Sequence, residues 1–168
     1  MIISKNLHQA RKNMQPDDLS KLDLSILREL QRDASQGQKE LAERLGASPS
    51  TIWRRVNDLE AAELISGKVA LLNAERVGFP VCVFVFVDLL RHEQSIRAAF
   101  ERFVQETPQI MECFSVTGAH DYTMIVRTRT VAEFEHLLME KILGHPSVRA
   151  ATSQIALRQQ KYSTALPI

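Results

Sequence analysis

Cysteine and long apolar runs are both scarce in this sequence. The two cysteines, Cys82 and Cys113, have no C-x-x-C spacing, which argues against a disulfide scaffold and against a zinc knuckle. The longest apolar run, Phe79 to Val87, is far shorter than the roughly 20 residues of a membrane-spanning helix. Polar residues follow Met1 to Leu7, where a signal peptide would have its apolar core. We therefore expect a cytoplasmic protein that does not enter a membrane.

Excess charge and catalytic motifs are lacking as well. The formal net charge is only +1. Binding to nucleic acid must then come from a local basic patch and from several copies of the chain acting together. The five histidines show no H-x-x-x-H spacing, and there is no nucleophile elbow, phosphate loop or H-E-x-x-H helix. We expect no metal, no cofactor and no enzymatic activity.

The composition is that of a folded protein, with 45% apolar and 24% charged residues. The length of 168 residues allows two small domains. Residues 1–17 are predicted to be a flexible N-terminal arm, with a basic strap for a phosphate backbone as the alternative. Residues 18–66 are predicted to form a helix-turn-helix domain, and residues 67–80 a connecting strand and hinge. Residues 81–168 remain for a second domain.

Three short helices are predicted in the first domain. Ser20-Lys21-Leu22-Asp23 has the pattern of a capping box, and an apolar stripe at i, i+3, i+4 spacing follows it. Gly46-Ala47 suits the turn after a second helix, because glycine adopts the left-handed conformation that ends helices. Ser48-Pro49 then starts a third helix with a serine cap and proline at its first position. Two helices that meet across such a turn are typical of a helix-turn-helix.

The third helix is predicted to present a polar face to DNA. Its apolar residues between Ile52 and Leu59 recur at i, i+4 and i+7, so its other face carries serine, arginine and asparagine. Arginine is a bidentate donor to guanine, asparagine pairs with adenine, and serine bonds to either. Arg55 lies between the two faces, where a phosphate contact is expected. Two alternatives stay open: a plain solvated face, and packing of Trp53 in place of a groove contact. The candidate DNA-binding residues are Ser48, Ser50, Thr51, Trp53, Arg54, Arg55 and Asn57.

The second domain changes to a strand pattern. A strand is predicted over residues 81–89. Its residues 81–87 alternate valine with other apolar residues, so both faces of the strand must be covered. This strand is followed by a helix and by strands over 109–117 and 122–128. A second helix then begins with Thr130-Val131-Ala132-Glu133, and the last strand runs from Val148 to Leu157. The order β-α-β-β-α-β predicts an α+β, ferredoxin-like domain with both helices on one sheet face. We expect another subunit on the other face.

Several runs of the sequence carry a resemblance to a known family. In the first domain they are Leu22-Asp23-x-x-Ile26-Leu27-x-x-Leu30-Gln31-x-Asp33, Glu40-Leu41-Ala42-x-x-Leu45-Gly46 and Ser48-Pro49-x-Thr51-Ile52-x-x-Arg55-Val56-x-x-Leu59-Glu60. Further on they are Ile65-x-Gly67-x-x-Ala70-x-Leu72-Asn73, Val77-Gly78 and Val116-Thr117-Gly118-Ala119-His120-Asp121-Tyr122. Over about residues 18 to 167, the chain resembles the Lrp/AsnC (leucine-responsive regulatory protein-like) transcriptional regulators.

The resemblance implies a fold and a function. It implies a winged helix-turn-helix followed by a ferredoxin-like effector and oligomerisation (RAM) domain, and a homodimer that assembles to a tetramer or octamer. Effectors of such regulators are usually amino acids or related metabolites, bound between dimers near a Gly-x-x-Asp loop. The chain departs from the family pattern at Asn57-Asp58, at Glu63 and in the middle of that loop.

The loop has a physical rationale of its own. Gly118 lets the backbone turn so that N–H groups face a carboxylate, and Asp121 could accept a hydrogen bond from an ammonium group. The alternative is a plain hairpin between two strands. The candidate effector-binding residues are Gly118, Ala119, His120, Asp121, Tyr122, Thr152, Ser153 and Gln154.

The predicted function is that of a sequence-specific transcriptional regulator whose binding to double-stranded DNA, or whose assembly, responds to an amino-acid-like effector. The alternative is a metabolite-binding oligomer whose N-terminal helices mediate protein contacts. An enzyme on a ferredoxin-like scaffold is a third reading.

Overall fold

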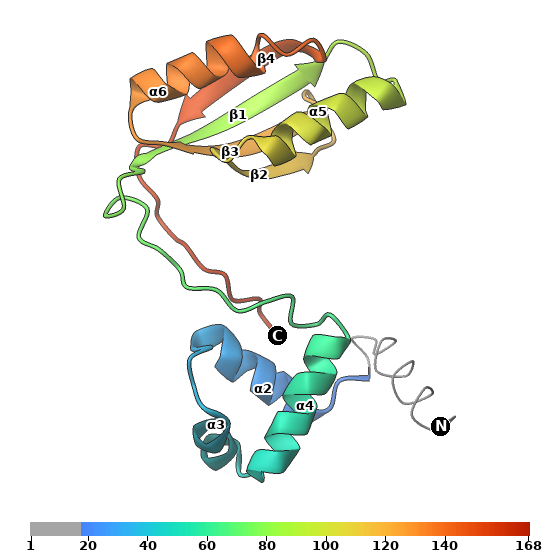
Figure 1. The fold of residues 1–168 in the computed structure, drawn as a ribbon, viewed down its shortest axis with the longest axis vertical. Helices are drawn as coiled ribbons and strands as arrows, with labels where there is room; N and C mark the ends of the chain where they lie inside the picture. Colours follow the sequence, from blue (N-terminus) through green and yellow to red (C-terminus); the bar gives the residue numbers. More distant parts are fainter. Residues whose placement is uncertain (1–17) are drawn as a thin grey trace. The chain divides into compact units, whose positions relative to one another are not determined.

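The computed structural model describes residues 18–168, which form two compact units (Figure 1). The first unit holds residues 18–70 together with 161–168, and the second holds residues 71–160. The arm predicted for residues 1–17 lies outside the described residues. The division differs from the sequence prediction in two respects. The last eight residues belong with the N-terminal helices, and the predicted connection, residues 67–80, is divided between the two units after residue 70.

The described residues of the first unit contain three α-helices: α2 (Lys21–Arg32), α3 (Gln38–Leu45) and α4 (Pro49–Ala61). The predicted capping box is present, since the Ser20 hydroxyl accepts from the Asp23 N–H at 3.2 Å and Asp23 accepts from the Ser20 N–H at 2.9 Å. Gly46 ends α3 with φ 62°, and Ser48 caps α4. The apolar stripes of the helices meet in a buried core of Ile26, Leu27, Leu41, Ala42, Ile52, Val56 and Leu59.

The strand predicted between the two domains does not form within the described residues of the single chain. Residues 67–73 have no regular structure, and Val69 and Leu72 are 79% and 74% exposed. A strand needs a neighbour to satisfy its N–H and C=O groups, and within the described residues no strand pairs with this segment.

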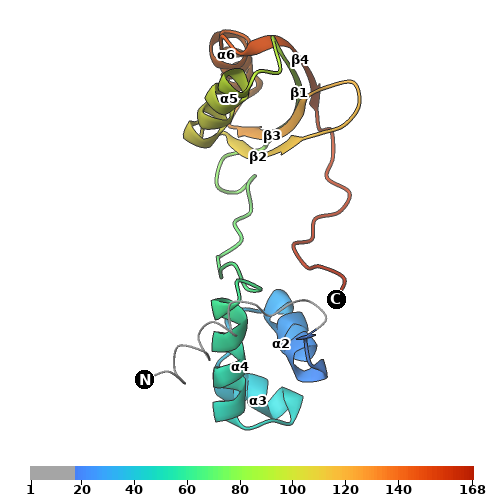
Figure 2. The same cartoon turned by 90° about the vertical axis from the view of Figure 1, so that its right-hand side faces the viewer.

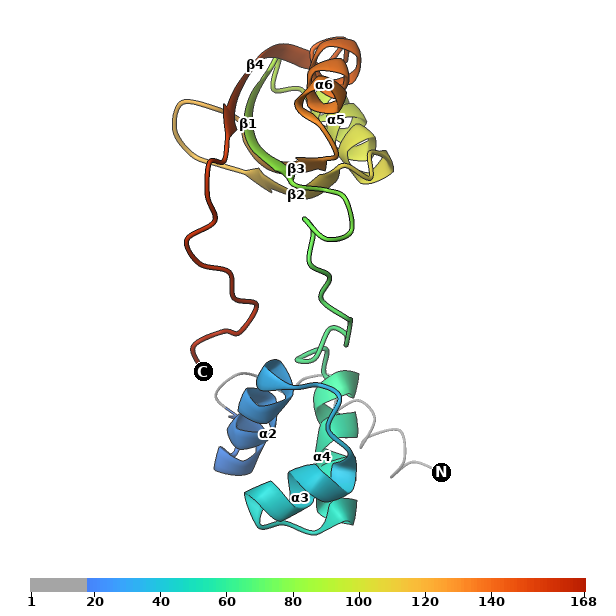
Figure 3. The same cartoon turned by 90° about the vertical axis from the view of Figure 1, so that its left-hand side faces the viewer.

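The second unit has the predicted order of elements. They are β1 (Val81–Leu89), α5 (Gln94–Glu106), β2 (Ile110–Ser115), β3 (Tyr122–Thr128), α6 (Val131–His136), its π-helical continuation η2 (Leu137–Ile142) and β4 (Val148–Ile155). The sheet has four antiparallel strands in the order β2-β3-β1-β4. Both helical segments cover one face of this sheet, and the opposite face carries no helix of the unit (Figures 2 and 3). The ferredoxin-like prediction is confirmed.

The alternation in β1 decides which side chains face the helices. Val83, Val85 and Val87 are fully buried among residues of α5, β3 and α6. Phe84 and Phe86 point to the other face, where Phe84 is 39% exposed. One face of the sheet thus packs against the helices. The other face carries apolar side chains, and no helix of the described chain covers it.

Candidate DNA-binding helix and effector loop

The start of α4 gathers three hydroxyl groups. Ser48 accepts from the Thr51 N–H at 3.1 Å, and its Oγ lies 3.0 Å from the Ser50 Oγ and 2.8 Å from the Thr51 Oγ1. The first turn of this 13-residue helix has no acidic residue. The N-terminus of a helix attracts anions, because its N–H groups and the helix dipole present positive charge there. This end of α4 is suited to a phosphate or to the edge of a base.

The outer face of α4 matches the prediction in most positions. Ser50 and Arg54 are exposed, and Asn57 is half-buried. Trp53 is 53% exposed and does not belong to the core of the unit. The alternative that Trp53 packs inside is therefore wrong, because its position on the helix lies outside the stripe that contains Ile52 and Val56.

Arg55 has a structural partner that the sequence did not reveal. Its guanidinium lies 3.6 Å from the carboxylate of Asp23, which is 1% exposed. The pair joins α4 to the first turn of α2 inside the unit. Removing one member of a buried ion pair leaves the other charge uncompensated, which is strongly unfavourable. Asp23 was recognisable only as a capping residue, since its burial depends on how two distant helices cross.

The loop between β2 and β3 is braced against β1. Gly118 has φ 119°, a conformation that favours glycine, as the predicted turn requires. The Asp121 N–H donates to the Val87 C=O at 3.0 Å, and Asp121 Oδ2 accepts from the Leu89 N–H at 2.7 Å. Asp121 Oδ1 lies 3.5 Å from Nδ1 of His92. Asp121 therefore holds β1 where its register with β4 shifts, between Asp88 and Leu89.

His120 belongs to a cluster that sequence reasoning found only in part. Its Nδ1 lies 2.9 Å from Asp88 Oδ1, and its ring lies 5.4 Å from that of Phe86. The guanidinium of Arg149 donates to the second oxygen of Asp88 at 3.2 Å. Asp88 and Arg149 were missed because only the strand register brings them to the loop.

The other predicted effector residues lie on different surfaces. On β4, Thr152 pairs in register with Phe86 and Gln154 with Phe84, so both share the outward face, whereas Ser153 pairs with Val85 and falls on the opposite side. All three are exposed. The sequence prediction treated them as one polar stretch, but alternation divides it.

Tyr122 requires a correction. Its side chain is buried, its ring lies 4.9 Å from that of Phe100, and its hydroxyl donates to Glu101 at 3.0 Å. Burial, followed by this hydrogen bond, raises the pKa of Tyr122 to about 12. The residue faces the helices with Met124, so it lies in the core and does not join the loop.

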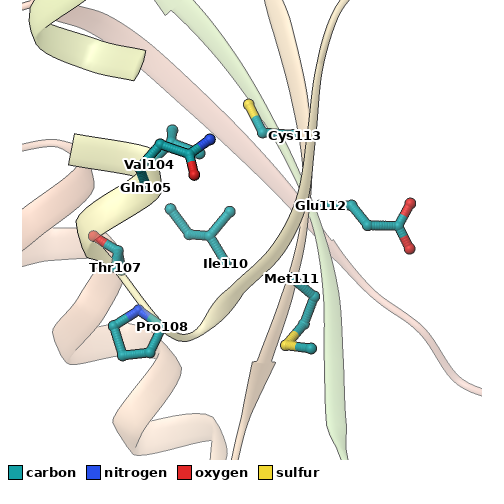
Figure 4. A pocket seen from close by; sticks show the side chains of 8 residues that line it. All are labelled: Val104, Gln105, Thr107, Pro108, Ile110, Met111, Glu112 and Cys113. Carbon is teal, nitrogen blue, oxygen red and sulfur yellow. The ribbon is translucent and has the colours of Figure 1, made fainter. Parts of the chain in front are cut away.

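A small pocket of about 190 Å³ lies between the end of α5 and β2 (Figure 4). None of the predicted effector residues lines it. Burial, followed by the charge of Glu101, raises the pKa of its Cys113 to about 11, so the thiol is neutral and a poor nucleophile at neutral pH. In the described part of the chain, no group of three or more histidine, cysteine, aspartate or glutamate residues could hold a metal ion. Among residues 18–168, no helix has the length and apolar character to cross a membrane.

Comparison with known families matches both units. Residues 19–66 match a family described as winged helix-turn-helix DNA-binding, and residues 82–166 match the Lrp/AsnC ligand binding domain. The leucine-responsive regulatory protein of Escherichia coli is 34% identical over 151 residues, which cover 90% of this chain and 92% of that protein. The glutamate uptake regulatory protein of Zymomonas mobilis is 30% identical over 150 residues, covering 89% and 91%.

Solved structures show the same similarity. A transcriptional regulator from Neisseria meningitidis, crystallised as a complex with L-Met, superposes with a TM-score of 0.86 at 33% identity, over 89% of this chain and 96% of that one. An AsnC family transcriptional regulator from Agrobacterium tumefaciens gives a TM-score of 0.84 at 31% identity, over 89% and 97% of the two chains.

Proposed function

Since the chain belongs to the Lrp/AsnC family of DNA-binding transcriptional regulators, we propose that α4 reads its DNA site and that an amino acid or related metabolite, bound at the ferredoxin-like unit, changes that reading. The exposed face of α4 is the observation that supports its role in DNA reading. Ser50, Trp53 and Arg54 project from its first two turns, while Ile52 and Val56 are buried. Residues at this end of a recognition helix meet base edges in the major groove.

The residues of α4 divide the work of recognition. Arg54 and Asn57 read bases, because bidentate donors and amides discriminate base pairs in the major groove. The hydroxyls of Ser48, Ser50 and Thr51 bind phosphate or base edges at the helix N-terminus. Arg55 was expected at a phosphate, and its contact with Asp23 supports a second role, which is to fix the angle between α2 and α4.

The effector is proposed to bind beside the loop of Gly118 to Asp121. An ammonium group would approach Oδ1 of Asp121, whose Oδ2 already accepts from Leu89. The nearby guanidinium of Arg149 is 62% exposed in its side chain and is suited to a carboxylate. An amino acid carries both an ammonium and a carboxylate group. The Neisseria relative crystallised with L-Met makes methionine, with leucine, a first choice for a test.

Assembly is proposed through the outward face of the sheet. Phe84 and, on β2, Phe114 are 39% and 52% exposed, and a contiguous apolar face of this kind marks a protein interface. We propose a homodimer that associates further, in the cytoplasm, without enzymatic activity. A second subunit would also bring another copy of Thr152 and Gln154 near a site.

The experiment is a binding titration with DNA from beside the protein's own gene, at several salt concentrations, with and without a panel of amino acids. Arg54→Ala should reduce the preference for this DNA over random DNA by about tenfold, the value of one good bidentate contact. Lys141→Ala, which removes an exposed positive charge from the second unit, is the matched control. Equal discrimination by wild type and Arg54→Ala would remove α4 from the proposed interface. Binding without steep salt dependence would favour the alternative of a metabolite-binding oligomer.

A further inference from the structure

The last residues of the chain bind to α2 through their main chain. Oε1 of Gln31 accepts from the Leu166 N–H at 2.6 Å, and Nε2 of the same side chain donates to the Leu166 C=O at 3.3 Å. One turn earlier on α2, Nε of Arg28 donates to the main-chain oxygen of Ile168 at 2.7 Å. Two side chains that are three positions apart on a helix share one face, so they form a single surface.

This surface contacts main-chain groups of the segment rather than particular side chains. The Gln31 amide pairs with both the N–H and the C=O of one residue, Leu166, as a residue of a neighbouring antiparallel strand would. The side chain of Leu166 is 70% exposed, and residues 161–168 are all exposed. The attachment therefore rests on three hydrogen bonds at the protein surface, with little apolar burial. Contacts of this kind open and close readily.

We propose that the Arg28–Gln31 surface of α2 is a docking site for the chain's own segment 161–168, and that the docked segment is a second connection between the sensing and DNA-binding units. The segment follows β4, the strand that carries Thr152 and Gln154. The other connection, residues 67–80, is largely exposed and has no helix or strand. A single exposed linker transmits little of a change at β4, whereas the docked segment restricts where α2 can lie and thereby biases the position of α4.

The regulatory half of this inference rests on the proposed function, and the docking half does not. A displacement of β4 by effector would pull on or release the docked segment, which changes the set of positions open to the DNA-binding unit. An effector can act in this way only if it binds the docked and undocked states with different affinity. Docking and effector response must then depend on each other.

Docking is tested by hydrogen exchange in the full chain, with the Leu166 amide resolved by NMR. The double variant Arg28→Ala/Gln31→Ala removes both anchors, and Lys21→Ala removes an exposed side chain from the same helix as control. We expect the Leu166 amide to exchange about tenfold faster in the double variant than in wild type or control, because its acceptor is lost. Equal exchange in wild type and double variant would overturn the docking.

The regulatory role is tested on the same proteins by DNA binding with and without L-methionine and L-leucine. The double variant should lose most of the shift in DNA affinity that amino acid causes in wild type, whatever its affinity in the absence of amino acid. A full response in the double variant would show that the docked segment passes no signal. If wild type neither binds this DNA nor responds, the proposed function fails, and the exchange rates still decide whether the segment docks.

Discussion

The two units build their candidate sites in opposite ways. In the first unit, one 13-residue helix supplies nearly all the proposed contacts, and neighbouring side chains on its surface are three or four positions apart. In the second unit, the side chains around the effector loop come from β1, the loop and β4, with Asp88 paired to both His120 and Arg149. The difference teaches that a DNA-reading surface can be encoded by local periodicity, whereas the effector site depends on the register of a sheet.

The largest effect is expected where the two faces of β1 are compared. Val85→Asp places a charge in the core between sheet and helices, where the wild-type side chain is fully buried, and should unfold the second unit at a cost of several kcal/mol. Phe84→Asp, one residue earlier, should leave the unit folded and abolish self-association. Circular dichroism and sedimentation of both variants make the comparison. A folded, dimeric Phe84→Asp protein would show that this face is not the interface.

Two adjacent arginines of α4 separate stability from recognition. Arg55→Ala leaves Asp23 buried without its cation and should lower the free energy of unfolding of the first unit by about 1–3 kcal/mol, because Arg55 itself is partly exposed. Arg54→Ala removes an exposed side chain and should change it by less than about 0.5 kcal/mol. Urea denaturation measures both.

The control is the double variant Asp23→Asn/Arg55→Met, which removes both charges but keeps an acceptor oxygen for the Ser20 N–H, and should recover much of the lost stability. If Arg54→Ala and Arg55→Ala were equally stable, the ion pair would not hold α4 in place.

Features that depend on local periodicity could be predicted from the sequence, and features that depend on how distant segments pack could not. Periodicities of 3.6 and 2 were enough for the three helices, the order of the four strands and the exposure of Ser50 and Arg54. The same periodicity could have placed Tyr122 correctly. Tyr122 and Met124 are two positions apart on one strand, so they share a face, and that face is the buried one. The contact of Asp23 with Arg55 could not be predicted, because it depends on the crossing of two helices.

The sheet site shows the same limit. Asp88 and Arg149 come together only through the pairing of β1 with β4, which includes a register shift at Asp88 and Leu89. A shift of one residue would move each side chain to the other face. Neither the shift nor the extra docking of residues 161–168 has a signal in the sequence pattern.

Asp121 allows a smaller, sharper test within the sheet site. Asp121→Ala removes the acceptor of the Leu89 N–H and should lower the free energy of unfolding by about 1–3 kcal/mol, besides losing the effector response. Asp121→Asn keeps an acceptor oxygen for Leu89 but loses the negative charge. It should be nearly as stable as wild type and still fail to respond to L-methionine or L-leucine.

Thermal unfolding measures the stability of the two Asp121 variants, and the DNA-binding titration measures their effector response. A normal response by Asp121→Asn would mean that Asp121 only braces β1 and that the ammonium group binds elsewhere. Gly118→Val should impair the response as well, because its φ of 119° is strained for a side chain with a branched Cβ.

The smallest expected effect concerns Trp53, and it tests whether this residue of α4 also contacts a base. An indole that is 53% exposed on a reading face offers an apolar surface, and the apolar group on a base edge in the major groove is the methyl of thymine. Replacing the contacted thymine by uracil in the operator removes only that methyl, and should weaken wild-type binding by about fivefold, near the lower limit of a base contact. Trp53→Ala should bind the two operators equally. The chain has a single tryptophan, so quenching of its fluorescence on binding reports the same contact without a label. Uracil substitution scanned across the operator without any difference between wild type and Trp53→Ala would place Trp53 outside the groove.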